Sequence, residues 1–197
     1  MTGLVLASKS AARAAVLRGA GVTFEAVGSG VNEDALKEEL LAHSQTPARI
    51  ATALAEAKAL AVAWERDGLV IGCDQTLELD GKLFDKADSL EEARERLRAL
   101  RGRTHELHSA VAVVRGNDVR FRELDSARMS MREFSDEWLD GYLARQGEAV
   151  LGSVGCYQLE GEGAQLFDHV VGDFFTILGL PLFGLLDFLR EEKVLGT

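Results

Sequence analysis

The chain has 197 residues and a hydrophobic fraction of 47%, which fit one globular domain over residues 1–197, with one or two lobes. Its formal net charge is −10, which argues against a protein that coats nucleic acid or an anionic membrane, because both need a basic surface. The net charge is compatible with a nucleotide substrate, because such a substrate needs only a local cluster of cations. The sequence has no membrane-spanning run and no signal-peptide pattern, so we expect a cytoplasmic protein.

The cysteines and histidines give no sign of a disulfide or zinc framework. Cys73 and Cys156 lie far apart in apolar segments, so we expect free, buried thiols. His105 and His108 stand three positions apart in a predicted strand, which puts them on opposite faces. They are therefore not expected to bind a metal together.

The first predicted elements are a strand over residues 3–7 and a helix over residues 10–19. The segment Ser8–Ser10 lies at their junction, where unpaired backbone N–H groups and the helix dipole favour an anion such as phosphate. Arg13 adds a positive charge in the first helical turn. The alternative is that one of the two serines only caps the helix.

A second strand is predicted over residues 23–27, followed by helices over residues 34–41 and 47–64. Lys58 lies at the edge of the buried stripe of the second helix. Its ammonium either reaches into a cleft or lies in water while its stem covers the core. Glu33 is predicted to lie in an acidic loop, a setting that is usually a solvated surface.

An apolar strand predicted over residues 69–73 ends at Asp74. A carboxylate at the end of such a strand could hold a divalent metal or orient a water molecule. The alternative is an aspartate that turns the chain before the next hairpin. An Asp-Gly turn predicts that hairpin between residues 76–79 and 82–84. Lys86 follows the hairpin, and its position alone indicates neither a structural nor a functional role.

The rest of the chain continues to alternate between strands and helices. The predicted elements are a helix over residues 89–102, strands over 105–114 and 119–132, a helix over 136–146, a strand over 164–171 and a helix from Pro181. The glycine-rich segment 152–163 either lets the backbone approach a ligand or forms a mobile surface loop. Gln158 and Glu160 within it could contact a base. The pattern predicts an α/β domain with a mixed sheet.

Taken in order, these motifs resemble the Maf family of nucleoside triphosphate pyrophosphatases over nearly the whole chain. The segments that carry the resemblance are Leu6–Ser10, Glu33, Ala55–Ala59, Ile71–Thr76, Leu100–His105, Gly155–Gly163 and Gly172–Leu182. The resemblance implies an elongated mixed sheet flanked by helices, with a catalytic cleft between two lobes. It also implies hydrolysis of a nucleoside triphosphate to the monophosphate and pyrophosphate with Mg²⁺ or Mn²⁺, by a chain that forms a homodimer.

The resemblance also implies a role for each candidate residue, and the chemistry of the reaction agrees. Attack on the α-phosphorus needs cations along the triphosphate and a carboxylate for water and metal. Asp74 is the expected general base or activator of a metal-bound water, Lys58 and Lys86 are further catalytic residues, and Glu33 is a second metal ligand. The expected phosphate-binding residues are Ser8, Lys9, Ser10 and Arg13, and the expected nucleoside contacts are Gln75, Gln158 and Glu160.

The chain departs from the family pattern in its first helix. Ala11 and Ala12 stand where relatives have proline and arginine, so Arg13 carries more of the charge. The Asp-Gln pair within Cys73–Thr76 is closer to the branch that acts on 7-methyl-GTP. An alternative function is a non-catalytic nucleotide-binding regulator of cell division or septum formation. A third is an enzyme similar to the inosine triphosphate pyrophosphatase group, which shares the reaction.

Overall fold

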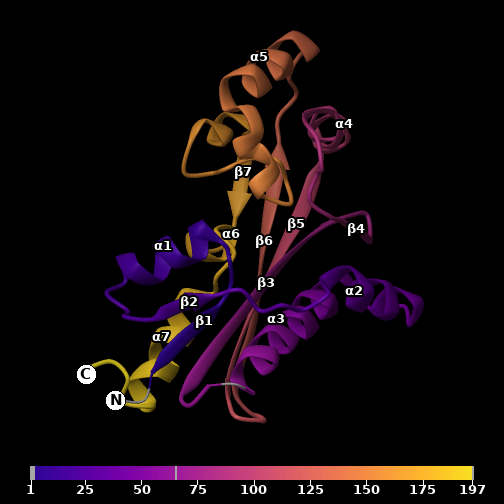
Figure 1. Cartoon of the computed structure of the whole chain (residues 1–197). Coiled ribbons are helices and arrows are strands. Elements are labelled where there is room, and N and C mark those ends of the chain that lie inside the picture. Colours follow the sequence, from indigo (N-terminus) through magenta and orange to yellow (C-terminus); the bar gives the residue numbers. More distant parts are fainter. Residues whose placement is uncertain (1–2, 65, 197) are drawn as a thin grey trace.

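A computed structural model describes residues 3–64 and 66–196. The strands in these ranges are β1 Leu4–Ala7, β2 Glu25–Val27, β3 Leu69–Leu79, β4 Lys82–Phe84, β5 Thr104–Arg115, β6 Asp118–Met131 and β7 Phe167–Val171. They form one seven-stranded mixed sheet in the order β2-β1-β3-β5-β6-β7, with β4 paired to β3 beside this path (Figure 1). β1 pairs in parallel with β2 and β3, and the other pairs are antiparallel.

Helices flank this sheet along its length (Figure 1). They are α1 Ala11–Gly19, α2 Glu33–Ala42, α3 Pro47–Ala63, α4 Leu90–Leu100, α5 Asp136–Gln146, α6 Phe174–Ile177 and α7 Leu182–Glu191, with the 3-10 helices η1 Gly147–Gly152 and η2 Glu162–Leu166. α3 packs against β3 and β5, α1 and α7 lie near the parallel strands, and α4 and α5 lie at the opposite end. The predicted α/β class with an elongated mixed sheet is confirmed.

Separate hydrophobic cores stabilise the two ends of the molecule. Leu6 of β1 and Leu17 of α1 belong to one core, which also contains residues of α7. Leu97 of α4 and Tyr142 of α5 belong to the other. β3 and β5 contribute residues to both cores, so these long strands join two lobes.

Several helices begin where the sequence places a capping hydroxyl group. Ser10, Thr46, Ser89 and Ser135 each accept a hydrogen bond from the backbone N–H three residues later. Pro47 occupies the first position of α3, where its missing N–H costs nothing. These local hydrogen bonds explain why the sequence predicts these helix starts.

α3 lies very close to β3 because small residues face each other at their contact. A Cβ atom at Gly72 would lie 2.0 Å from Ala55 O and 2.9 Å from Ala59 Cβ. Only glycine permits this approach of helix to strand. Asp74 follows Gly72 by two positions and points to the same face, so the contact brings it beside Lys58 of α3.

The structure corrects some predicted boundaries. The predicted strands over 69–73 and 76–79 form one strand, β3, because antiparallel pairing with β5 continues across the junction. The predicted strand over 164–171 begins only at Phe167, since η2 precedes it. The short α6 and η1 were not predicted, because they have too few residues to show a helical period.

The cysteines and histidines lie as the sequence predicts. Cys73 and Cys156 are buried, free thiols. His105 Nε2 lies 2.6 Å from Tyr157 Oη, whereas His108 contacts other side chains on the opposite face. The described ranges contain no helix that is long and apolar enough to cross a bilayer.

Candidate active site

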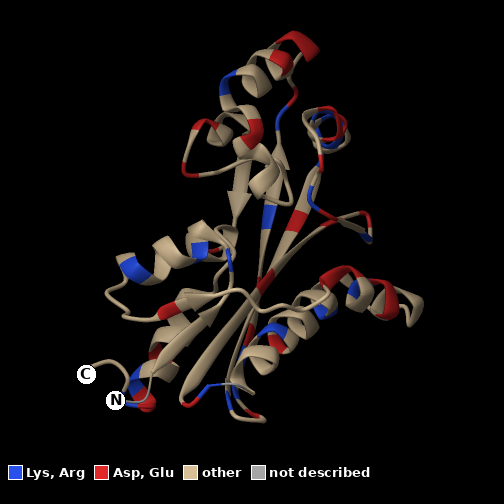
Figure 2. Ribbon diagram, in the orientation of Figure 1, with Lys and Arg blue, Asp and Glu red and all other residues tan. Residues whose placement is uncertain are grey.

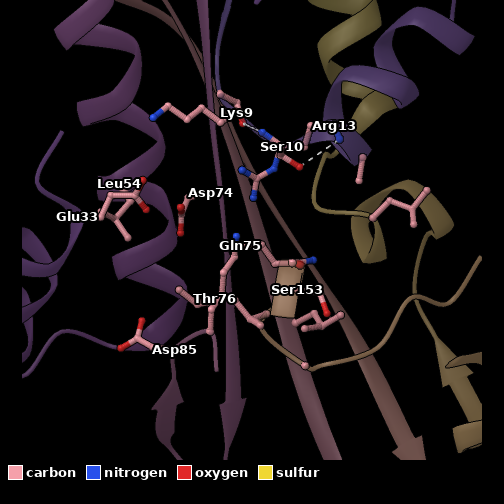
Figure 3. A pocket seen from close by; sticks show the side chains of 18 of the residues that line it. Lys9, Ser10, Arg13, Glu33, Leu54, Asp74, Gln75, Thr76, Asp85 and Ser153 are labelled. Atoms are coloured by element: carbon pink, nitrogen blue, oxygen red, sulfur yellow. Dashed lines mark hydrogen bonds between the residues drawn. The ribbon is translucent and has the colours of Figure 1, made fainter. Parts of the chain in front are cut away.

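A cleft of about 990 Å³ lies between the two lobes, as predicted (Figure 3). The β1–α1 junction, the start of α2, the middle of α3 and β3, the segment after β4 and the glycine-rich segment 152–163 all contribute to its walls. Every candidate residue predicted from the sequence lines this cleft: Ser8, Lys9, Ser10, Arg13, Glu33, Lys58, Asp74, Gln75, Lys86, Gln158 and Glu160. The fold therefore gathers these residues from distant parts of the chain.

Lys58 joins two carboxylates in the cleft. Its Nζ lies 2.7 Å from Asp74 Oδ1 and 2.8 Å from Glu33 Oε2. The side chains of Lys58 and Asp74 are only 8% and 9% exposed. Buried charges need a partner, so the three side chains act as one unit. The prediction that Lys58 reaches into a cleft is confirmed, and the alternative of an ammonium in water is wrong.

The structure corrects the local setting of both carboxylates. Asp74 lies inside β3, paired with Ala110 of β5, and does not follow the end of a strand. Glu33 is the first residue of α2 and does not lie in a loop. The last parallel pair of β1 with β3 joins Ala7 and Gly72, so Asp74 lies just beyond the carboxyl end of β1. Ligands of α/β proteins commonly gather at this end of parallel strands.

The surroundings of Asp74 suit a proton acceptor. Burial raises the pKa of Asp74, while the positive charges of Lys58 and Arg13 oppose the rise. A raised pKa makes the ionised carboxylate a stronger base than an exposed aspartate. Burial also raises the pKa of Cys73 to about 11, so that thiol stays protonated at neutral pH.

The β1–α1 junction is a capped helix start, a kind of place where proteins commonly bind anions. Ser10 Oγ accepts a hydrogen bond from Arg13 N at 3.4 Å, and Ser8 Oγ accepts one from Ser10 N at 3.2 Å. Ser10 therefore caps the helix, as predicted. Ala11 and Ala12 line the cleft, and N–H groups in the first turn of a helix have no partner inside the helix. The capped helix start thus still presents N–H groups to an anion.

Two backbone carbonyl groups hold the side chain of Arg13 in the cleft. Its Nε donates to Gly179 O at 2.8 Å, and its Nη1 donates to Cys73 O at 3.0 Å. These bonds fix the plane of the guanidinium and leave its other N–H groups for an anion. Sequence reasoning missed the contact with Gly179, because 166 positions separate the two residues.

Two lysines add positive charge at the rim of the cleft. Lys9 is exposed, and its stem covers Gly28, where a Cβ atom would lie 2.7 Å from Lys9 Cε. Lys86 lies in the segment after β4, and partial burial together with the charge of Arg13 lowers its pKa. Arg13 of α1, Lys58 of α3 and Glu33 of α2 also line this cleft. Figure 2 shows that α1 and α3 carry basic positions and that α2 carries acidic ones.

The predicted nucleoside contacts differ in their availability. Gln75 Nε2 donates to the carbonyl oxygens of Thr176 and Ile177, at 3.1 and 3.0 Å. This amide nitrogen is therefore engaged within the protein, and only the amide oxygen of Gln75 is left for a ligand. Gln158 and Glu160 line the cleft and are exposed.

The glycine-rich segment is anchored to the core. Ser153 Oγ donates to Tyr157 O at 2.7 Å and accepts from Tyr157 N at 3.0 Å. The buried Tyr157 hydroxyl group contacts His105 Nε2. These contacts hold the backbone next to Gln158, so the segment is a packed wall of the cleft. Sequence patterns gave no signal for the pair of Tyr157 and His105, which are 52 positions apart.

The two carboxylates fit a divalent metal that is bound together with phosphate. Among the described residues, no three histidine, cysteine, aspartate or glutamate side chains form a metal-binding group. Mg²⁺ is commonly held by one or two carboxylates and by the phosphate oxygens of a substrate. Glu33 and Asp74 supply such a pair, although the ammonium of Lys58 already lies between them.

The fold and the cleft define an α/β protein with a charged cleft between two lobes. The chain belongs to the Maf family, since the family model described as Maf-like protein matches residues 3–192. A nucleoside triphosphate pyrophosphatase of Caulobacter vibrioides is 62% identical over 99% of this chain and 98% of that protein. A 7-methyl-GTP pyrophosphatase of Rhizobium meliloti is 50% identical over 95% of each chain. A solved HAM1 protein from Coxiella burnetii has a TM-score of 0.41 at 14% identity, over 66% of this chain and 73% of that one.

Proposed function

We propose that the chain hydrolyses nucleoside triphosphates to the monophosphate and pyrophosphate in this cleft. One observation carries the proposal: a helix start with Arg13, suited to an anion, shares the cleft with a buried carboxylate, Asp74, that is paired with Lys58. Relatives that are named for this reaction match nearly the full length of the chain. The protein is thus a hydrolase that acts on acid anhydrides.

In this proposal the triphosphate binds along the start of α1. The N–H groups of the first turn, the hydroxyl group of Ser8 and the guanidinium of Arg13 bind its oxygens, and Lys9 and Lys86 add charge from the rim. Negative charge grows on the leaving pyrophosphate as the bond to the α-phosphorus breaks. Cations that are already fixed in place stabilise this charge more in the transition state than in the ground state.

Asp74 takes the proton of the water that attacks the α-phosphorus. Lys58 orients the Asp74 carboxylate through its 2.7 Å contact and favours the ionised form. Glu33 holds Lys58 from the other side at 2.8 Å. A Mg²⁺ or Mn²⁺ ion bound by Glu33 and Asp74 would neutralise phosphate charge and lower the pKa of the water.

The nucleoside contacts in this proposal are Gln158, Glu160 and the amide oxygen of Gln75. The Asp-Gln pair of β3 supports 7-methyl-GTP as the first substrate to test. A guanine methylated at N7 carries a positive charge, which the carboxylate of Glu160 would favour.

Pyrophosphate release from a panel of triphosphates tests the proposal. The panel contains 7-methyl-GTP, the common ribonucleotides and deoxynucleotides, each with Mg²⁺ and with Mn²⁺. We expect pyrophosphate as the first product and a loss of at least about 1,000-fold in kcat for Asp74→Asn. Asp118→Asn, at the exposed first position of β6, is the matched control. Orthophosphate as the first product, or full activity of Asp74→Asn, would contradict the proposal, and tight binding without turnover would favour a regulator.

The proposal includes a homodimer located in the cytoplasm. The family resemblance supports the dimer, and the location is supported by the acidic composition together with the finding that no described helix could span a membrane. Sedimentation velocity of the purified chain tests the assembly. A single species with the mass of one chain at micromolar concentration would contradict the dimer.

A further inference from the structure

Arg96 of α4 connects two segments that line the cleft. Its side chain is only 7% exposed, and its Nη1 donates to Asp85 O and, at 2.8 Å, to Val154 O. Asp85 directly precedes Lys86, and Val154 lies in the glycine-rich segment that carries Gln158. One guanidinium therefore joins the segment of a proposed phosphate ligand to the segment of a proposed nucleoside ligand.

Further contacts fix this guanidinium and reinforce the junction. Arg96 Nη2 donates to Glu92 Oε1 at 3.2 Å, and Arg96 Cζ lies 5.2 Å from the centroid of the Phe84 ring. Ala87 and Cys156 are both buried in the same hydrophobic core, so the two segments also meet there. Phe84 and Ala87 flank the segment that contains Lys86. The junction is thus built from several contacts around one arginine.

The segment after β4 is also held from the side of α2, but more weakly. Lys37 Nζ lies 2.5 Å from Asp85 Oδ1, and the Asp85 side chain is 60% exposed. Exposed ion pairs contribute little to stability, because water screens both charges. The part-buried hydrogen bonds of Arg96 cost more to lose, because its side chain is only 7% exposed and water screens and replaces these bonds less. Arg96 is therefore the stronger of the two attachments.

We propose that Arg96 is a positioning residue that sets the spacing between Lys86 and Gln158 across the cleft. The inference rests on the proposed function, which assigns both of these residues to the substrate. An arginine suits this place because its planar fork donates to several acceptors at fixed angles, whereas a lysine ammonium is a compact point charge. Without the fork, the two segments move independently, and the enzyme binds both ends of the nucleotide less tightly.

The test compares Arg96→Lys and Arg96→Met with Arg94→Met. Arg94 lies on the same helix, and its partner is Asp140 on the surface, so this variant is a matched control. The measurements are kcat, KM, and the inhibition constants of pyrophosphate and of the nucleoside monophosphate. We expect Arg96→Lys to lower kcat/KM by about 10- to 100-fold, mainly through KM, and to raise both inhibition constants. The control should stay within about twofold.

A double-mutant cycle separates positioning from a general loss of stability. If Arg96 acts through Lys86, Lys86→Met costs less in the Arg96→Lys background than in the wild type. Independent losses that multiply, or unchanged inhibition constants with only a lower Tm, would overturn the inference. Arg96→Lys keeps the positive charge and the aliphatic stem of Arg96, so the double-mutant cycle can be measured even if Arg96→Met does not fold. A wild type that releases no pyrophosphate would overturn both proposals, whereas an active wild type with unchanged Arg96→Lys would overturn this one alone.

Discussion

A single added methyl group at Gly72 tests whether α3 must lie this close to β3 for catalysis. The new Cβ atom would lie 2.0 Å from Ala55 O and 2.7 Å from Ala59 N. Non-bonded atoms of this kind need about 3 Å or more, so α3 must move away by about 1 Å. Because Lys58 belongs to α3 and Asp74 to β3, their 2.7 Å contact lengthens by a similar distance.

Two magnitudes follow for Gly72→Ala. Overpacking of this kind costs about 1–3 kcal/mol of stability, and a shift of about 1 Å in catalytic groups lowers kcat by about 100-fold. Urea denaturation measures the first, and pyrophosphate release at saturating triphosphate measures the second. Gly19→Ala is the control, because a Cβ atom there meets nothing within 4 Å. A variant that loses stability as expected but keeps kcat within about twofold would refute the link between this packing and the contact of Lys58 with Asp74.

Three further predictions concern the charges of the cleft. The stability of Asp74→Asn relative to the wild type should increase from strong acid to neutral pH. Burial raises the pKa of Asp74, so the native state of the wild type loses stability as pH rises through that pKa, whereas Asp74→Asn has no such loss. Urea denaturation of both proteins in strong acid and at neutral pH measures the difference. The KM of the wild type should rise at alkaline pH as Lys86 loses its proton, because burial lowers its pKa, whereas the KM of Lys86→Arg should stay flat. In the absence of nucleotide, Lys58→Met should bind Mn²⁺ at least about tenfold more tightly than the wild type, because the wild-type ammonium lies between Glu33 and Asp74. An unchanged Mn²⁺ affinity in an electron paramagnetic resonance titration would contradict this.

Local patterns predicted those parts of the site that depend on neighbouring residues. A serine before a helix caps it within a few positions, and the structure shows this for Ser10. The burial stripe of α3 placed Lys58 at the edge of the core, and the family motifs selected candidates that all line one cleft. The same patterns misjudged Asp74, because pairing with β5 rather than local composition extends β3 beyond it.

The amino-acid sequence alone determines the alternation of strands and helices, the helix starts and the types of chemical group that the site contains. Hydrogen-bond caps, turn residues and burial periods act over a few positions, and so they can be recognised along the chain. Only the tertiary structure decides that Glu33 and Asp74 share Lys58, that Gly179 holds Arg13, and that Arg96 joins two walls of the cleft. These contacts depend on how closely distant elements pack across the sheet, a property that no local pattern encodes.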